Sequence, residues 1–309
     1  MKIFTGNANP KLAEGIANNL DIPLGDIQIT RFPDGEISVK VVENIRGSDV
    51  FMIQPICYPP NEHLMELLIV IDALRRASAA RITAVMPFYG YGRQDRKDQP
   101  RVPITAKLVA NLLVAAGASR VLTMDLHTQQ IQGFFDIPVD HLCAAPVMVK
   151  HLREKQFKNI VIVSPDPGGM KTAYAYSQMM NSELAIVAKQ RTSPRSVETY
   201  QIVGEVAEHT AIIVDDLVTT GGTLCAAANL LKKKGAHDIY AVVTHAVMIP
   251  EAFEDLGRSA IKEFIVTDSV PLRVPTSSAP IQVLTVADLL AEAIRRIHSN
   301  QSVSSLFNI

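Results

Sequence analysis

The chain has 309 residues, of which 48% are hydrophobic and only 6% are aromatic, and it contains no tryptophan. This length exceeds the usual size of one domain, and the aliphatic composition is typical of an α/β core rather than a β-sandwich. A net charge of -1 excludes a broad basic surface for nucleic acid or membrane, so any anion must be bound by local loops and side chains.

The cysteine content and the apolar runs indicate a cytoplasmic protein. The three cysteines, Cys57, Cys143 and Cys225, show no metal-ligand spacing, and an odd, sparse set is typical of a reducing compartment. The N-terminal segment has no signal-peptide hydrophobic region, and no apolar run reaches the length that spans a bilayer. We therefore expect no membrane segment.

Strand-like aliphatic runs alternate with amphipathic helical runs along almost the whole chain, which favours βαβ units in mostly parallel sheets. In the first half, strands are predicted at 50–56, 82–88 and 120–127, and helices at 62–79 and 106–118. The same alternation recurs over 159–166, 168–180, 183–191, 210–217, 225–235, 238–247, 262–270, 281–286 and 287–299. We expect two α/β domains, 1–143 and 144–296, with the tail 297–309 returning to the first.

Polar residues follow several of these aliphatic runs directly. In open α/β sheets ligands sit outside the carboxyl ends of the strands, so such residues are the first candidates for a site. Four places qualify: the neighbourhood of Arg93, the segments 125–128 and 164–169, and the stretch 211–224.

The stretch 211–224, AIIVDDLVTTGGTL, places an acidic pair and a loop of small residues between a strand and a helix. The glycines let the backbone approach a phosphate, and the N–H groups at the helix start supply donors. Carboxylates repel the phosphate but accept hydrogen bonds from vicinal sugar hydroxyls. The loop alone is more typical of a helix cap with turn glycines, whereas strand, acids and loop together favour a ribose phosphate site. The candidate residues are Asp215, Asp216, Thr219, Thr220, Gly221, Gly222 and Thr223.

This stretch resembles the phosphoribosyl-binding signature of the phosphoribosyltransferase fold. Further segments, among them RFPDGEISVKVVENIRGSDVF, YGRQDRKD, MDLHTQQIQGFFDIPVDHL, SPDPGGMK and AEAIRRIHSNQSVSSLF, narrow the resemblance to the ribose-phosphate diphosphokinases, or phosphoribosyl pyrophosphate synthetases. The resemblance spans nearly the whole chain. It implies two phosphoribosyltransferase-like domains, each a mostly parallel sheet flanked by helices. The implied reaction, a step of nucleotide biosynthesis, transfers the diphosphoryl group of MgATP to the C1 hydroxyl of ribose 5-phosphate and releases AMP.

The resemblance implies that Mg²⁺ is bound by His127 and Asp166. Magnesium prefers oxygen ligands and retains waters, so Asp166 is the more natural ligand on physical grounds. A histidine in the place of His127 is, by itself, more often a strand-end hydrogen-bonding residue. Only the family resemblance favours the ligand role.

Two further segments are implied to bind ATP. A guanidinium in YGRQDRKD suits phosphate oxygens, and the aromatic ring and carboxylates of RFPDGE suit adenine. The ordinary alternative for YGRQDRKD is a solvated charged loop, and that for RFPDGE is a hairpin turn. In the family the second segment reaches a neighbouring subunit's site, which implies a homo-oligomer, a hexamer built from dimers. The implied residues are Phe32, Asp34, Gly35, Glu36, Arg93 and Gln94.

Lys189 and Arg191, in AIVAKQRTSPRSVETY, match the catalytic flexible loop of the family. Both are implied to stabilise the transferring group, and Arg191 also to contact ribose 5-phosphate. An exposed basic turn is the alternative. Thr219 departs from the family pattern, which commonly has an acidic residue there, and Pro167 replaces a small residue. A hydroxyl at position 219 can still donate to phosphate, but a contact made by the family's acid is not carried over.

Regulation is also implied by the resemblance. In phosphate-activated, ADP-inhibited members an arginine and a serine-bearing tail contribute to an effector site between subunits. Arg46 and the residues Ser302, Val303 and Ser304 match that pattern. We expect phosphate and ADP as effectors.

Two other functions compete with this interpretation. A nucleobase phosphoribosyltransferase would use the same loop, but it has no need of RFPDGE and GRQDRKD. A catalytically silent regulatory paralogue would bind nucleotide without turnover, and it has no reason to retain Lys189, Arg191, His127 and Asp166 together.

Overall fold

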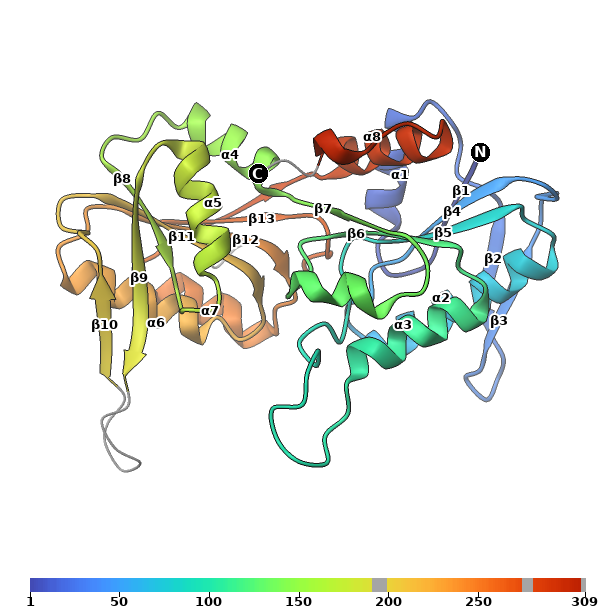
Figure 1. Cartoon of the computed structure of the whole chain (residues 1–309), viewed down its shortest axis with the longest axis horizontal. Coiled ribbons are helices and arrows are strands. Elements are labelled where there is room, and N and C mark those ends of the chain that lie inside the picture. The colour runs from blue at the N-terminus through green and yellow to red at the C-terminus, as the bar shows by residue number, and fades with distance from the viewer. Residues whose placement is uncertain (191–198, 274–279, 307–309) are drawn as a thin grey trace. The chain divides into compact units, whose positions relative to one another are not determined.

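The computed structural model describes residues 1–190, 199–273 and 280–306, which form two compact units that are each considered alone. Unit 1 comprises Met1–Cys143, Ser269–Pro271 and the described residues from Thr285, and unit 2 comprises Ala144–Asp268 and the described part of Leu272–Leu284. The labels of Figure 1 are used below. Among the described helices, none is long and apolar enough to cross a membrane.

Unit 1 is built on a five-stranded sheet in the order β1-β4-β5-β6-β7. Each neighbouring pair is parallel, as expected for strands joined by helical crossovers. The strands are β1 (Lys2–Thr5), β4 (Asp49–Ile53), β5 (Arg81–Met86), β6 (Arg120–Met124) and β7 (Val139–Leu142). The interior strand β4 is buried at every residue, in agreement with a sheet covered on both faces.

The described α-helices of unit 1 each bury an apolar face, whereas the 3-10 helix at 304–306 buries no residue. The helices of the unit are α1 (Pro10–Asn19), α2 (Pro60–Arg76), α3 (Thr105–Ala116), the 3-10 helix η1 (Gln129–Phe134), α8 (Ala287–His298) and the 3-10 helix η3 (Ser304–Leu306). The α1 N-terminus follows local rules, because Asn9 Oδ1 accepts from the N–H of Leu12 and Pro10 occupies the first turn.

The helix α8 belongs to unit 1 and lies beside α1, the red and the blue helix of Figure 1. Asn19 Nδ2 on α1 donates to Asp288 Oδ1 on α8 at 2.6 Å. The packing is close, since a Cβ built on Gly15 would lie 3.1 Å from that of Ala287. Unit 1 thus takes in a longer C-terminal segment than the tail 297–309 that the sequence analysis associates with the first domain.

An antiparallel hairpin of β2 (Ile27–Arg31) and β3 (Ile37–Val41) completes unit 1. The hairpin packs partly buried apolar residues, including Ile29 and Val39, against the core of the unit. Its tip is the PDGE segment, so the hairpin-turn interpretation of that segment is confirmed.

Unit 2 contains a seven-stranded sheet in the order β10-β9-β8-β11-β12-β13-β14. Every pair is parallel except β9 with β10, which are antiparallel. The strands are β8 (Ile160–Ser164), β9 (Glu183–Gln190), β10 (Thr199–Val203), β11 (Thr210–Val218), β12 (Ile239–Ala246), β13 (Glu263–Thr267) and β14 (Ile281–Leu284). The helices are α4 (Ala145–Glu154), α5 (Met170–Met180), α6 (Gly222–Lys233) and α7 (Pro250–Arg258).

The central strand β11 covers the predicted run 210–217 and one further residue, Val218. It continues past the acidic pair to Val218, and Leu217 still lies opposite His245 of β12. Asp215 and Asp216 therefore lie within β11, inside the predicted run 210–217, and not between the strand and the helix as the motif 211–224 suggested. Pairing with β12 extends β11 through two residues of low strand propensity, which shows tertiary context overriding local preference.

Candidate active site

The loop between β11 and α6 presents backbone donors at the carboxyl edge of the unit 2 sheet. Gly221 adopts φ 75°, a left-handed conformation that favours glycine, and α6 begins at the next residue. Among the described residues, no side chain caps this helix. Its first N–H groups therefore face the loop without an intrahelical partner, an arrangement suited to an anion.

The loop is also held by the segment that connects β12 to α7. The N–H of Ile249, just before α7, donates to the carbonyl of Thr219 at 3.2 Å. The side chains of Thr220 and Thr223 are exposed. These hydroxyls surround the helix start and add donors to the backbone N–H groups.

The acidic pair lies at the end of β11, directly before the loop. Burial, followed by the negative charge of Asp216, raises the pKa of the Asp215 carboxyl to about 8. The charge of Asp166 adds to the same shift, which places the end of β8 within electrostatic reach of the pair. A pair that holds a proton near neutral pH can both donate to and accept from sugar hydroxyls.

Asp166 follows β8, next to β11 in the sheet. Its Oδ1 accepts from the N–H of Gly168 at 2.7 Å and from that of Gly169 at 3.1 Å. The carbonyl of Asp166 in turn accepts from the hydroxyl of Ser164 at 2.6 Å. The two glycine N–H groups thus hold the carboxylate of Asp166 in place.

The donor set at this edge fits magnesium. Among the described residues, no group of three or more His, Cys, Asp or Glu side chains forms a ready-made cage. Magnesium does not need one, since it is usually held by one or two carboxylates together with substrate phosphates and waters. The carboxylate of Asp166 is exposed and has one oxygen fixed by two amides, and so it meets that requirement.

In unit 1, the loop after β5 carries Arg93 and Gln94, and both side chains are exposed. The loop is anchored on α3: the carbonyl of Gln94 accepts from the N–H of Ala106 at 3.2 Å, and its side-chain oxygen accepts from the hydroxyl of Thr105. With Oε1 engaged, the Gln94 amide offers its N–H donors to a ligand.

His127 lies in the loop after β6 and is exposed. Asp125, just before it, has φ 36°, so the chain turns sharply as it leaves the strand. His127 and Asp166 belong to units 1 and 2, respectively, and each is placed within its own unit.

The four hairpin residues lie at the tip of β2–β3, where all are exposed. The N–H of Gly35 donates to the carbonyl of Phe32 at 2.9 Å, and that of Glu36 donates to Asp34 Oδ1 at 3.2 Å. The Phe32 ring is 53% exposed, which leaves an aromatic face available for stacking.

Lys189 ends up inside β9, where its backbone lies opposite Tyr200 of β10. Its side chain and the whole of Arg191 lie outside the described residues. The structure therefore describes where this segment begins and leaves the roles of both residues as predictions.

The four residues matched to an effector site all belong to unit 1, and three of them, Arg46, Ser302 and Ser304, are exposed. The tail forms its own turn, in which the N–H of Ser304 donates to the hydroxyl oxygen of Ser302 at 3.2 Å. Arg296, on α8, donates to the carbonyl of Ser302 at 3.3 Å.

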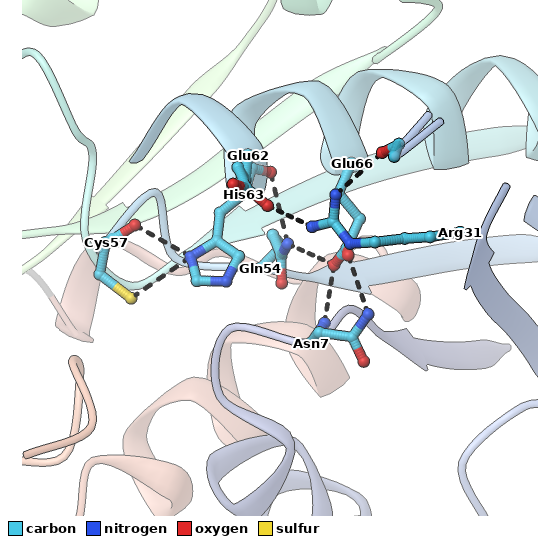
Figure 2. Close-up of polar contacts among 8 residues, drawn as sticks. Asn7, Arg31, Gln54, Cys57, Glu62, His63 and Glu66 are labelled. Carbon is cyan, nitrogen blue, oxygen red and sulfur yellow. Dashed lines mark hydrogen bonds and ion pairs between the residues drawn. The ribbon is translucent and has the colours of Figure 1, made fainter. Parts of the chain in front are cut away.

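Figure 2 shows a buried polar network that the sequence analysis missed. Glu66, on α2, is 4% exposed and accepts from Gln54 Nε2 at 2.7 Å, while the Asn7 N–H and side-chain amide donate to it at 2.7 and 2.8 Å. A Cβ on Gly6 would lie 2.3 Å from Gln54 Oε1, so only glycine permits this approach. The network joins the ends of β1 and β4 to α2.

The same view contains a cysteine and a histidine, and their geometry excludes a nucleophilic pair. His63 Nδ1 lies 2.9 Å from the carbonyl oxygen of Cys57 and 3.9 Å from its Sγ. Since a carbonyl only accepts, Nδ1 carries the proton and cannot take one from the thiol.

The fold and site define an α/β protein of the phosphoribosyl-binding class, with an acid pair and an uncapped helix start at the end of a central parallel strand. Residues 1–117 match the family model for the N-terminal domain of ribose phosphate pyrophosphokinase, and residues 191–308 match that for the phosphoribosyl synthetase-associated domain.

Full-length relatives agree with these models. The ribose-phosphate pyrophosphokinases of Caldanaerobacter subterraneus and Bacillus caldolyticus are 52% and 51% identical over 308 residues, which cover 99% and 100% of this chain and 98% of each relative. The crystal structure of phosphoribosylpyrophosphate synthetase from Mycobacterium smegmatis is 41% identical with a TM-score of 0.91, over 97% of this chain and 99% of that one. The chain belongs to the ribose-phosphate pyrophosphokinase family.

Proposed function

We propose that the protein transfers the diphosphoryl group of ATP to the C1 hydroxyl of ribose 5-phosphate, giving 5-phosphoribosyl 1-pyrophosphate and AMP. The observation that carries the proposal is the end of β11, where the acid pair is followed, after residues 217–221, by the uncapped start of α6. Relatives that match the whole chain and are named for this reaction support it. The first 117 residues match the synthetase N-terminal model, which favours this function over a nucleobase phosphoribosyltransferase.

Ribose 5-phosphate is proposed to bind in unit 2. The phosphate would accept from the N–H groups at the start of α6 and from the threonine hydroxyls of the loop. The vicinal hydroxyls of the sugar would meet Asp215 and Asp216, which lie in β11 ahead of the loop. This arrangement separates the phosphate from the carboxylates, which would otherwise repel it.

The ATP site is proposed to combine the exposed cationic loop of Arg93 and Gln94 with the ring of Phe32. His127 and Asp166 are the proposed holders of Mg²⁺. When bound, the metal would supply positive charge to the oxygens of the transferring group. The role left to the protein's side chains is to orient the nucleotide. Hydrogen-bond donors held in fixed positions suit this role better than a strong base does.

Lys189 and Arg191 are proposed to neutralise charge on the diphosphoryl group during transfer. The backbone of Lys189 lies near the end of β9, next to its final residue Gln190, and this position at the carboxyl edge of the unit 2 sheet supports the proposal. Removal of one such donor typically reduces turnover by about 100- to 1,000-fold.

We also propose assembly into a homohexamer, with the hairpin tip reaching a neighbouring subunit, and regulation by phosphate and ADP at Arg46 and residues 302–304. The exposed Phe32 and the exposed side chains of Arg46, Ser302 and Ser304 support these roles. The cytoplasm is the proposed compartment, in keeping with three free cysteines.

The test is a product assay with ribose 5-phosphate, ATP, Mg²⁺ and phosphate, in which AMP and the sugar diphosphate are separated by chromatography. The wild type should yield both in equal amounts, and Lys189→Ala should lose most of the rate. Lys233→Ala, an exposed lysine at the far end of α6, is the matched control and should behave as the wild type. Nucleotide binding without AMP release would contradict the proposal and indicate a silent paralogue.

A further inference from the structure

The loop that carries His127 is bound by a side chain on each flank. On one side, the hydroxyl of Thr128 donates to Asp95 Oδ2 at 2.7 Å. Gln130 Nε2 approaches the same oxygen at 3.4 Å. Asp95 therefore ties the loop after β6 to the loop after β5.

On the other flank, the N–H of Leu126 donates to His141 Nε2 at 2.9 Å. His141 lies on β7, where it is opposite Thr123 in the parallel pairing with β6. Since a backbone N–H only donates, Nε2 must be the unprotonated nitrogen of the ring. Gln132 Nε2 lies 3.4 Å from the other ring nitrogen, Nδ1.

Asp95, the acceptor of the bond from Thr128, lies in a loop that is itself held by backbone hydrogen bonds. Asp95 directly follows Gln94, whose carbonyl receives the N–H of Ala106 on α3 and whose own N–H donates to Tyr91 at 3.0 Å. The bond between Asp95 and Thr128 thus joins two loops of one unit, each anchored on its own element. One loop bears Arg93 and the other bears His127.

We infer that Asp95 and His141 are positioning residues that set the His127 loop against the Arg93 loop before MgATP binds. The inference rests on the proposed function, because it assumes that both loops serve MgATP. A loop that is already ordered loses less entropy when the ligand binds, so affinity rises without any added contact.

Loss of either bond should affect the binding of MgATP more than that of ribose 5-phosphate. Loss of one flanking bond should weaken MgATP binding by about three- to tenfold, the range expected for one intramolecular hydrogen bond. Ribose 5-phosphate, proposed to bind in unit 2, should be affected less than twofold. A general loss of stability would instead affect both substrates.

The experiment measures MgATP binding by isothermal titration calorimetry without ribose 5-phosphate, followed by KM for each substrate. Thr128→Val removes the hydroxyl and Thr128→Ser restores it. His141→Phe removes the acceptor, and His141→Gln offers an amide oxygen in its place. Ser119→Ala is the matched control, because this hydroxyl accepts from the N–H of Ile82 at 3.0 Å at the opposite end of the same sheet.

The expected result is weaker MgATP binding in Thr128→Val and His141→Phe, recovery in Thr128→Ser and His141→Gln, and wild-type binding in Ser119→Ala. Wild-type MgATP affinity in both Thr128→Val and His141→Phe would overturn the inference. Equal changes in both KM values, together with a lower thermal midpoint, would also overturn it, since they indicate a purely structural role. A wild type that releases no AMP would instead contradict the proposed function.

Discussion

The N–H of Asp216 donates to Oδ1 of Asp215 at 3.0 Å near the end of β11, and the charge of the Asp216 carboxyl also acts on that of Asp215. Burial and mutual repulsion make it costly for both to be ionised. The proton that relieves this cost is a property of the folded chain, because burial, the larger cause of the raised pKa, is lost on unfolding.

The stability of the unliganded protein should therefore fall as the pH rises toward 8. The pKa of Asp215 is about 8 in the folded chain and near 3.8 ordinarily, so the folded state binds an extra proton between these values. Asp215→Asn removes this dependence. We expect the thermal midpoint of the variant, relative to that of the wild type, to rise steadily from pH 5 to pH 8. Scanning calorimetry at several pH values measures this difference. Parallel curves for the two proteins would contradict the shifted pKa.

Substitutions of the two adjacent glycines should separate backbone strain from phosphate contact. Gly221→Ala places a side chain at φ 75°, with an expected cost of about 1–2 kcal/mol and a lower thermal midpoint. Gly222→Ala lies outside that region of φ and has 3.8 Å to its nearest neighbour, Thr220 Oγ1, so its midpoint should stay unchanged. Both should raise KM for ribose 5-phosphate. A wild-type KM in Gly222→Ala would place the phosphate elsewhere.

Loss of the buried carboxylate of Figure 2 should destabilise unit 1. Glu66→Ala leaves three donor groups, contributed by Asn7 and Gln54, without their acceptor, at a cost of about 3 kcal/mol. Glu62→Ala, one turn earlier on α2, breaks only an exposed ion pair with Arg31 and should cost below about 1 kcal/mol. Urea unfolding of both variants tests the difference, and equal costs would show that burial does not govern this site.

Phe32→Ala should impair ATP use without affecting stability. The ring is 53% exposed, so its removal takes little apolar surface out of the core. Stacking of a base on an aromatic ring is worth about 1–3 kcal/mol, which corresponds to a KM for ATP at least fivefold higher. Val42→Ala, an exposed apolar residue at the other end of the hairpin, is the control. An unchanged KM in Phe32→Ala would exclude the ring from the ATP site.

Much of the fold could be predicted from local pattern. The aliphatic run 50–56 became β4, and the alanine-rich run became α6, because buried parallel strands and amphipathic helices leave strong periodic signals. The order of strands within each sheet leaves no such signal. The position of α8 beside α1 depends on contacts such as Asn19 with Asp288, which are distant in sequence.

In the candidate site, too, some residues could be predicted from local sequence and others could not. The loop 219–223 was found because glycines and threonines between a strand and a helix have a direct chemical meaning. Asp95 and His141 were missed, since their partners are known only once β6 and β7 pair and the two loops meet. The motif 211–224 suggested an acid pair beyond the strand, whereas pairing with β12 keeps both aspartates inside β11.

The most direct measurement follows the two terminal phosphorus atoms of ATP. The wild type is incubated with ribose 5-phosphate, Mg²⁺ and ATP labelled at both the β- and the γ-phosphorus, and the products are separated. We expect both labels in the sugar product, in equal amounts, and unlabelled AMP. A sugar product that carries a single label, with ADP as the other product, would contradict diphosphoryl transfer.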